Sequence, residues 1–182
     1  GTTSSITGTG TLAIAPINVN TSIGLGTSAI GTLNLDATEL SFIQDGFASI
    51  TIGRVDGAHA IEITGGTFTD PVIFSAPADG GTISLSGTLL GLGNASFTFN
   101  GPGHTTTLAG DIITEGNPIT FNDAVVIRTD VILDTTNGGS VPQGASIAFN
   151  GPVDGFQPSQ QSLVLRAGTE GNITFAAPVG AS

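Results

Sequence analysis

Short apolar strands, each closed by a turn residue, follow one another along almost the whole chain. Each strand carries two large apolar side chains two residues apart, so both point to the same face. The residue between them is usually small or polar and points the other way. Clear instances are residues 11–14, 32–35, 49–52, 60–63, 82–85, 96–99, 118–121, 146–149, 162–165 and 172–175. This pattern favours a β-solenoid, in which stacked coils share one apolar core.

The spacing of the strands predicts one all-β solenoid domain over residues 1–182. Two or three strands would make one coil of roughly 20–25 residues, which gives about seven to nine coils. Pairs such as Asp45-Gly46 and Asp56-Gly57 suit bends that need a positive φ. In a solenoid these bends are corners between faces, but in a hairpin they join antiparallel strands. An antiparallel β-sandwich or jelly roll is therefore the alternative fold.

Residues 36–45 have a different pattern. Asp36 is followed three residues later by Glu39, which is typical of a capping box. Leu40 and Ile43 are three residues apart, and Gly46 can end a helix in the left-handed region. We expect one short helix here, which interrupts the solenoid.

Residues 121–134 show the alternation best and predict which side chains are buried. Those expected to point inward are Phe121, Val125, Ile127, Val131 and Leu133. Those expected to face water are Asn122, Ala124, Arg128, Asp130 and Asp134. Arg128 and Asp130 would then form an exposed pair that contributes at most about 1 kcal/mol.

The charge and the missing residue types exclude several classes of function. The chain has 14 acidic and 3 basic residues and a net charge of −11, which repels nucleic acid and anionic lipid. It has no Cys, which excludes disulfides, thiolate zinc sites and Cys nucleophiles. It also lacks Trp and Tyr, on which binding hot spots and sugar-stacking platforms depend. No apolar run approaches the ~18–20 residues that span a bilayer, so we expect no membrane insertion.

A secreted enzyme that cleaves acidic polysaccharides is the enzymatic alternative, because many β-helices do this. It would need grouped acids and a base on one face. The available residues are Asp123, Asp130, Asp134 and Arg128, but Asp123 has the inward parity and the chain has no lysine. Solvated turn and strand residues are the simpler interpretation, and we expect no enzyme and no catalytic residues.

Three further kinds of functional site have less support in the sequence. His59 and His104 lie in loops and are expected to be solvated, without a Ser-His-Asp arrangement. The Asp-Gly turns could hold weak surface calcium, which makes a calcium-dependent binding module the third alternative, although no cofactor or dedicated metal site is expected. Flat Thr rows can bind ice, but the threonines do not repeat at a fixed coil length. They are therefore expected to be outward β-branched fillers.

Residues 43–57, Ile-Gln-Asp-Gly-Phe-Ala-Ser-Ile-Thr-Ile-Gly-Arg-Val-Asp-Gly, carry a resemblance to a known class. Together with Thr67-Phe68-Thr69-Asp70-Pro71 and Ile173-Thr174-Phe175, they resemble a module of giant secreted bacterial repeat proteins, notably cyanobacterial ones. These are similar to filamentous-haemagglutinin-like adhesins. The resemblance implies a right-handed parallel β-helix, export to the cell surface, and a role in a fibre, sheath or adhesive matrix. It implies no catalytic residues.

The first 26 residues carry no charge and are a candidate assembly segment. Their apolar residues are Leu12, Ile14, Ile17, Val19, Ile23 and Leu25. An uncharged strand beside an open sheet edge invites pairing with another chain, so this segment could complete the sheet of a neighbour. It could equally form the first coils of its own solenoid. We expect partners to be copies of the chain or adjacent modules, joined head to tail.

Overall fold

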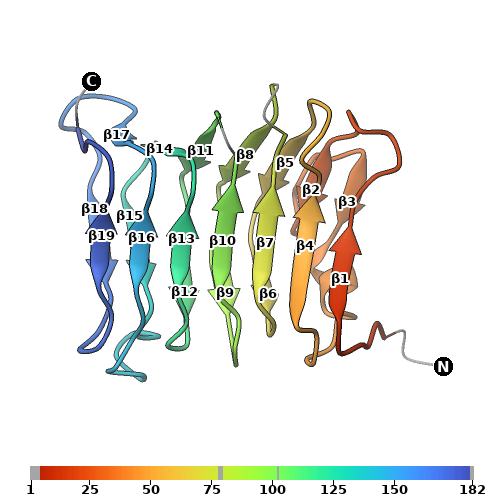
Figure 1. The fold of residues 1–182 in the computed structure, drawn as a ribbon, viewed down its shortest axis with the longest axis horizontal. Coiled ribbons are helices and arrows are strands. Elements are labelled where there is room, and N and C mark those ends of the chain that lie inside the picture. The colour runs from red at the N-terminus through yellow and green to blue at the C-terminus, as the bar shows by residue number, and fades with distance from the viewer. Residues whose placement is uncertain (1–4, 78–79, 102, 181–182) are drawn as a thin grey trace.

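Strands make up most of the protein, and they lie in three parallel sheets. The computed structural model describes residues 5–77, 80–101 and 103–180, which contain 19 short strands and one short helix. The strands of each sheet lie side by side along the length of the molecule, with the N- and C-terminal ends at opposite ends of the stack (Figure 1). The predicted all-β architecture of stacked strands is confirmed.

Sheet 1 contains seven strands that follow one another in chain order. They are β1 (Thr11–Ile14), β4 (Ser49–Gly53), β7 (Val72–Ser75), β10 (Phe97–Asn100), β13 (Ile119–Phe121), β16 (Ile147–Phe149) and β19 (Ile173–Phe175). If each coil contributes one strand to sheet 1, the seven strands correspond to seven coils, the lower limit of the predicted range.

Sheet 2 also has seven strands, whereas sheet 3 has five. Sheet 2 consists of β3 (Leu33–Leu35), β2 (Ile23–Leu25), β5 (Ala60–Ile63), β8 (Thr82–Leu85), β11 (Thr105–Leu108), β14 (Ala124–Ile127) and β17 (Val153–Gly155). Sheet 3 consists of β6 (Gly66–Phe68), β9 (Leu89–Gly91), β12 (Ile112–Thr114), β15 (Val131–Asp134) and β18 (Leu163–Arg166). From β4 onward the chain visits sheets 1, 2 and 3 in turn, which is consistent with a parallel β-helix.

Every pair of these named strands is parallel, so the antiparallel sandwich or jelly roll is wrong. Parallel neighbours cannot be joined by a two-residue hairpin, because the chain must first return to the start of the next strand. The Asp-Gly turns therefore act as corners. Gly46 and Gly57 have φ values of 128° and 86°, which glycine adopts without the steric cost of a Cβ.

A ladder of phenylalanine rings fills the core behind sheet 1. Phe99 stacks on Phe121 at 4.7 Å between ring centroids, and Phe121 stacks on Phe149 at 5.1 Å. The parallel register places these residues directly beside one another, so each ring meets the next. Each aromatic pair adds about 0.5–1.5 kcal/mol beyond the burial of its area.

The predicted inward residues of the 121–134 segment are confirmed. Phe121, Val125, Ile127, Val131 and Leu133 are all buried. The prediction for Asp134 is wrong, because this side chain is buried at 2% exposure although its parity points outward. The chain turns at the end of β15, and the following residues fold over Asp134 and hydrogen bond to it.

The predicted helix exists but is shorter than expected. Helix α1 spans Ala37–Leu40, and the side chains of Asp36 and Glu39 form the predicted capping box. It ends at Leu40 because Ser41 is the C-cap and Ile43 already pairs with Ile6 in a parallel bridge.

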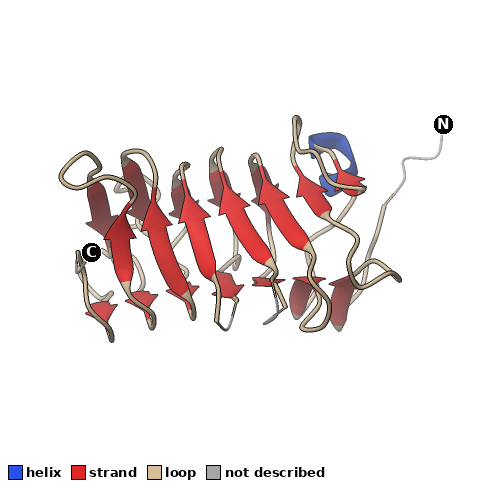
Figure 2. Cartoon of the chain, turned by 90° about the horizontal axis from the view of Figure 1, so that it is seen from above, coloured by secondary structure: helices blue, strands red, loops and turns tan. Residues whose placement is uncertain are grey.

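Helix α1 takes the place of a sheet 3 strand near the N-terminal end of the stack. Between β3 and β4 the chain forms α1, whereas between each later strand of sheet 2 and the next strand of sheet 1 it forms a strand of sheet 3. The helix lies at one end of the stack, near β6, as a view from above shows (Figure 2). Sheet 3 is therefore covered by a helix at its N-terminal end.

Candidate functional site

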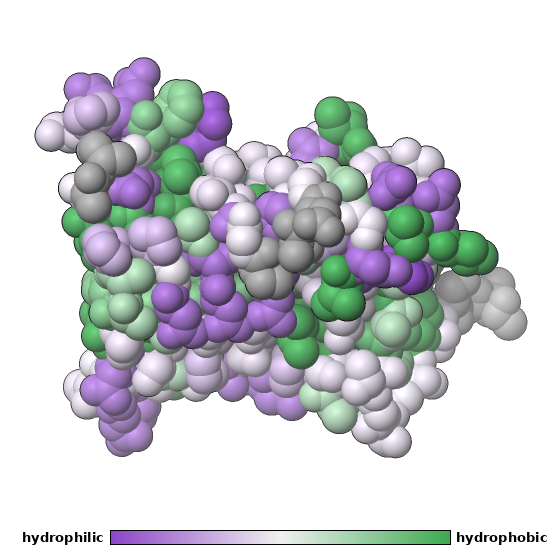
Figure 3. Space-filling view, turned by 45° about the horizontal axis from the view of Figure 1, so that its top comes forward, coloured by the Kyte–Doolittle hydropathy of each residue, from purple (hydrophilic) through white to green (hydrophobic). Residues whose placement is uncertain are grey.

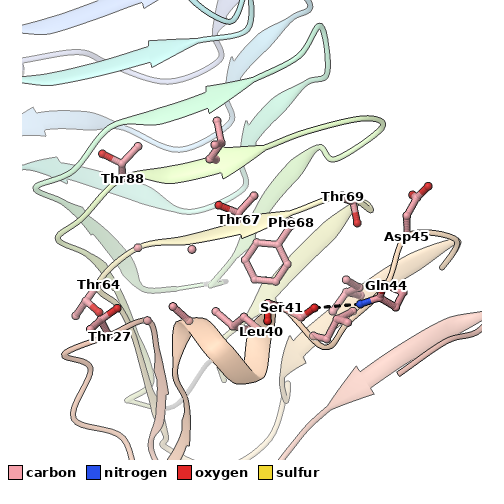
Figure 4. A pocket seen from close by; sticks show the side chains of 17 residues that line it. Thr27, Leu40, Ser41, Gln44, Asp45, Thr64, Thr67, Phe68, Thr69 and Thr88 are labelled. Carbon is pink, nitrogen blue, oxygen red and sulfur yellow. Dashed lines mark hydrogen bonds between the residues drawn. The ribbon is translucent and has the colours of Figure 1, made fainter. Parts of the chain in front are cut away.

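A cavity of about 750 Å³ lies between α1 and the first strands of sheet 3. Leu40 from α1 and Phe68 from β6 form its apolar part, and threonine side chains such as Thr67 and Thr88 surround it (Figure 4). Alternate residues of a parallel strand bond to opposite neighbours. The amide of Gly66 and the carbonyl of Phe68 bond toward β9, so the backbone of Thr67 points toward α1 and the cavity.

The polar side chains that line this cavity are mostly hydroxyl and amide groups. Ser41 and Gln44 are engaged locally: the Gln44 amide donates to the Ser41 carbonyl at 3.0 Å, and the Ser41 hydroxyl donates to the Thr38 carbonyl at 2.6 Å. Asp45 supplies the only ionisable group in the described lining. The described lining contains no histidine, cysteine or lysine.

The residues considered for polysaccharide cleavage are each held by a different partner. Asp130 accepts a hydrogen bond from the amide of Ser162 at 2.8 Å, which lowers its pKa. The Arg128 guanidinium lies over the ring of Phe156, 3.9 Å from its centroid. The expected Arg128–Asp130 ion pair is absent among the described residues, although both side chains are exposed as predicted.

Asp134 anchors the turn that follows β15. Burial would raise its pKa, but hydrogen bonds from Thr136, Arg166 and Gly138 hold the pKa below its usual value. Its Oδ1 accepts bonds from the amide and the hydroxyl of Thr136, both at 2.6 Å. Arg166 reaches Oδ2 at 3.3 Å. This carboxylate is a structural anchor on sheet 3.

Asp123 is buried, as its inward parity predicted, and its pKa is raised. Burial raises the pKa of Asp123 to about 7, against the opposing effect of the hydrogen bond from Thr106. The Thr106 hydroxyl donates to Oδ2 at 2.5 Å, and buried Oδ1 has no partner among the described residues. The structure therefore does not bring Asp123, Asp130 and Asp134 into one cleft.

The two histidines differ from the prediction of solvated loop residues. His59 is 1% exposed, and its Nδ1 lies 3.2 Å from the carbonyl of Val19. Its Nε2 accepts the amide of Arg54 at 3.3 Å, so this histidine joins the 16–20 loop to the loop after β4. The prediction is wrong for His59, because residues distant in sequence pack over it. His104 is half-buried, with a buried Nε2 that has no partner in the described part of the chain.

The residues of the candidate assembly segment lie mostly in the chain's own sheets. Leu12 and Ile14 of β1 are half-buried against the core, and Ile23 and Leu25 of β2 are fully buried. Other residues of the segment are less enclosed: Val19 is half-buried and Ile17 is 99% exposed. Residues 1–4 lie outside the described residues. Strands β1 and β2 thus belong to sheets 1 and 2 of this chain, and assembly through the segment remains a prediction.

The C-terminal end of the stack exposes apolar core positions. Phe175 continues the phenylalanine ladder, stacking on Phe149 at 4.9 Å, yet it is 40% exposed whereas Phe149 is 0% exposed. Ile173 of the same strand is 46% exposed, whereas its neighbour Ile147 is fully buried. Hydrophobic surface is visible at this end of the molecule, at the left of Figure 3.

The outer face of sheet 1 carries a pattern that the sequence analysis missed. One outward row is Ala13, Thr51, Ile73, Thr98, Thr120, Ala148 and Thr174. The row beside it is Thr11, Ser49, Pro71, Ser96, Pro118, Ser146 and Asn172. We call these two rows the neutral face, since neither contains an acidic or basic residue.

Thr98 and Thr120 are the only threonines that are direct neighbours along either row, so the threonines do not form the stacked plane that the sequence analysis argued against. Thr98 and Thr120 are 22 residues apart, whereas Thr120 and Ala148 are 28 apart, yet all three lie side by side. The loops between the strands differ in length, so residues of successive strands can lie side by side without a fixed number of residues between them. The repeated pattern of a small polar or proline residue two positions before an uncharged outward residue could have revealed the rows.

No family model, curated protein or solved structure matches the chain. The described residues contain no helix with the length and apolar character that a bilayer crossing requires. They also contain no group of three or more acidic or histidine side chains placed to share a metal ion. The resemblance to secreted adhesin-like repeat proteins stays a prediction.

Proposed function

We propose that the protein is a non-enzymatic structural module of an extracellular bacterial fibre, sheath or adhesin. It acts as a right-handed parallel β-helix, the hand that almost all parallel crossovers adopt. Copies join head to tail, so that the last strands of one copy pair with the first strands of the next. The localisation follows from the resemblance to secreted repeat proteins.

The observation that carries this proposal is the exposed end of the phenylalanine ladder. The inner positions of sheet 1 are apolar from Ile14 of β1 to Phe175 of β19, with one side chain beside the next. Among the described residues, Phe175 has a ring neighbour on one side only. A second copy would place its Ile14 on the open side of Phe175 and its Leu12 beside Ile173. This contact buries apolar surface and satisfies an open sheet edge.

Charge favours the same contact. Strands β1 and β19 contain no charged residue, so their pairing brings no like charges together despite the net charge of −11. Helix α1 covers sheet 3 at the N-terminal end, so the proposed contact uses sheets 1 and 2.

No observation favours the second function, cleavage of acidic polysaccharides. Its candidate residues hold separate structural partners: Asp123 binds Thr106, Asp130 binds Ser162, and Asp134 binds Thr136.

The absence of cysteine allows a direct test by cross-linking. Within the chain Thr174 lies beside Ala148, and the proposal places Thr174 of one copy beside Ala13 of the next. Neighbouring strands are about 4.8 Å apart, within reach of a short thiol cross-linker. The double variant Ala13→Cys/Thr174→Cys should give a ladder of oligomers on a denaturing gel.

The matched control pairs Thr174→Cys with Ala60→Cys, an exposed position on β5 in sheet 2. This pair should give only the background of random collisions. Equal ladders from the two pairs, or a wild-type chain that sediments as a monomer at high concentration, would refute the head-to-tail contact.

A further inference from the structure

The edge of sheet 2 at the C-terminal end is covered by residues 176–180, which we call the strap. Val179 of the strap forms a parallel bridge with Val153 of β17. The Val153 amide donates to the carbonyl of Pro178 at 3.0 Å, and the Val153 carbonyl accepts the amide of Gly180 at 2.8 Å. Val179 is 55% exposed, so its side chain adds little apolar burial to these two backbone bonds.

The strap occupies the position that one more strand of sheet 2 would take. The register partners across this sheet form a column of Leu33, Ile23, Ile61, Ile83, Thr106, Val125, Val153 and, in the strap, Val179. Leu33 belongs to β3, the last strand at the opposite end of the sheet (Figure 1). In a head-to-tail stack, β3 of the next copy is the strand that comes beside β17. Val179 of one copy and Leu33 of the next therefore compete for one position.

The number of layers in each sheet indicates which of the two gives way. Sheet 1 has seven strands, whereas sheet 2 has seven strands without the strap and eight layers with it. Neighbouring strands are about 4.8 Å apart, so two sheets that continue from copy to copy need equal numbers of layers. Sheet 3 has five strands, and a helix about 10 Å across beside β6 takes up two further layers. A repeat of seven layers fits all three sheets only when the strap leaves β17.

The backbone of β3 matches the edge that the strap covers. The amide of Leu33 and the carbonyl of Leu35 each form a hydrogen bond of 2.9 Å toward β2. Alternate residues of a parallel strand bond to opposite neighbours, so the amide of Asn34 points to the free side of β3. In the register of the column this amide meets the carbonyl of Val153, to which the strap donates in the single copy. Asn34 also lies beside Asp154 in that register, so the pairing brings no like charges together.

We propose that β3 of a second copy displaces the strap and pairs with β17. This inference rests on the proposed head-to-tail contact and adds the sheet 2 half of the same interface. Strand β3 brings the half-buried Leu33 and Leu35, whereas the described strap brings only Val179 as a large apolar side chain. The exchange therefore buries more apolar surface and replaces the backbone bonds that it breaks. In a single copy, the strap covers a sheet edge that would otherwise invite unspecific pairing.

Cross-linking tests the new contact. Asn34→Cys/Asp154→Cys places two thiols side by side only when β3 of one copy lies beside β17 of another, because these strands are at opposite ends of sheet 2 within one copy. A short thiol cross-linker should give a ladder of oligomers with this pair, as with Ala13→Cys/Thr174→Cys. A ladder from the sheet 1 pair alone would overturn this inference and leave the head-to-tail function standing. No ladder from either pair would overturn both.

A variant of the strap tests the competition. Val179→Gly removes the half-exposed valine from the strap, so the strap should be displaced more easily. The concentration at which half of the chains are assembled should fall by about fivefold, measured by sedimentation velocity. Unchanged or weaker assembly would contradict a strap that competes with the partner.

Variants of β3 test the other side of the exchange. Asn34→Pro removes the amide on the free side, a change that an edge strand tolerates, and should weaken assembly. Asn34→Ala is the matched control: both variants lose the side-chain bond to the Ala29 carbonyl, but only alanine keeps the backbone amide. The alanine variant should assemble like wild type. Equal assembly of the two folded variants would overturn the pairing of β3 with β17, and the cross-linking pair decides if the proline variant does not fold by circular dichroism.

Discussion

Burial and ionisation are in conflict at Asp123. Its side chain is 4% exposed, its pKa is raised to about 7, and its Oδ1 has no hydrogen-bond donor among the described residues. In the unfolded chain the same carboxyl group has a pKa near 3.8. A group whose pKa is higher in the folded state stabilises the fold at low pH, and this contribution is lost as pH rises toward the folded pKa.

Replacing Asp123 with Asn should therefore change the pH dependence of stability. The wild-type free energy of unfolding should fall between about pH 4 and pH 7, by up to about 4 kcal/mol for a shift of this size. Asp123→Asn keeps an oxygen that can accept the Thr106 hydroxyl but cannot ionise, so it should lose this slope and be more stable than wild type at pH 8. Urea unfolding at several pH values measures both effects.

The control is Asp130→Asn, at an exposed residue whose pKa is lowered. Removing the Asp130 carboxylate should lower stability at neutral pH, which is the opposite effect. A carboxyl group whose pKa is lower in the folded state than in the unfolded state stabilises the fold at pH values above the unfolded pKa. Parallel pH curves for wild type and Asp123→Asn would show that Asp123 is not the group responsible.

At the scale of the element, α1 is the one described segment that breaks the strand pattern. The helix has four residues, too few to be stable alone, so its capping box and its contact with β6 must hold it. Asp36 accepts the amides of Thr38 and Glu39 at 2.7 and 2.9 Å. The Glu39 carboxylate in turn accepts the amide of Asp36 at 3.0 Å.

Asp36→Ala should destabilise the N-terminal end by about 1 kcal/mol, the usual cost of losing an N-cap. Thr38→Ala is the control: it changes an exposed residue of the same turn whose amide, not its side chain, is bonded to Asp36. Thermal melting should show a lower midpoint for the first variant only. A similar decrease of the melting temperature in both variants would mean that the Asp36 cap does not stabilise the helix.

At the scale of the whole molecule, the strongest contacts between the described strands join neighbours within a sheet. Stability should therefore be greatest in the middle and least at an end with an open edge. Amides of β10 and β13 should exchange with solvent most slowly, and those of β19 should exchange fastest. Hydrogen exchange read by mass spectrometry measures this gradient.

Protein concentration distinguishes an open end from an intrinsically stable one. If copies stack head to tail, the amides of β19 should become protected as concentration rises, while those of β13 stay unchanged. Strong protection of β19 in dilute solution would contradict the view that this end is open.

The strand positions and the inward side chains could be predicted from the sequence, because alternation along a strand is a local property of the backbone. Ile127 and Leu133 are buried where their parity placed them. The capping box at Asp36 and Glu39 is equally local and is confirmed. The end of α1 was missed, since the bridge between Ile43 and Ile6 joins segments far apart in sequence.

Only the tertiary structure decided the direction of pairing and the register. The same Asp-Gly turns fit a hairpin or a corner, so parallel pairing could not be inferred from them. Thr120 and Ala148 lie side by side because hydrogen bonds between strands set the register, while the corner between them takes up extra residues. His59 and Asp134 are buried for a related reason: the segments that cover them are set by folding of the corners, which strand alternation does not describe.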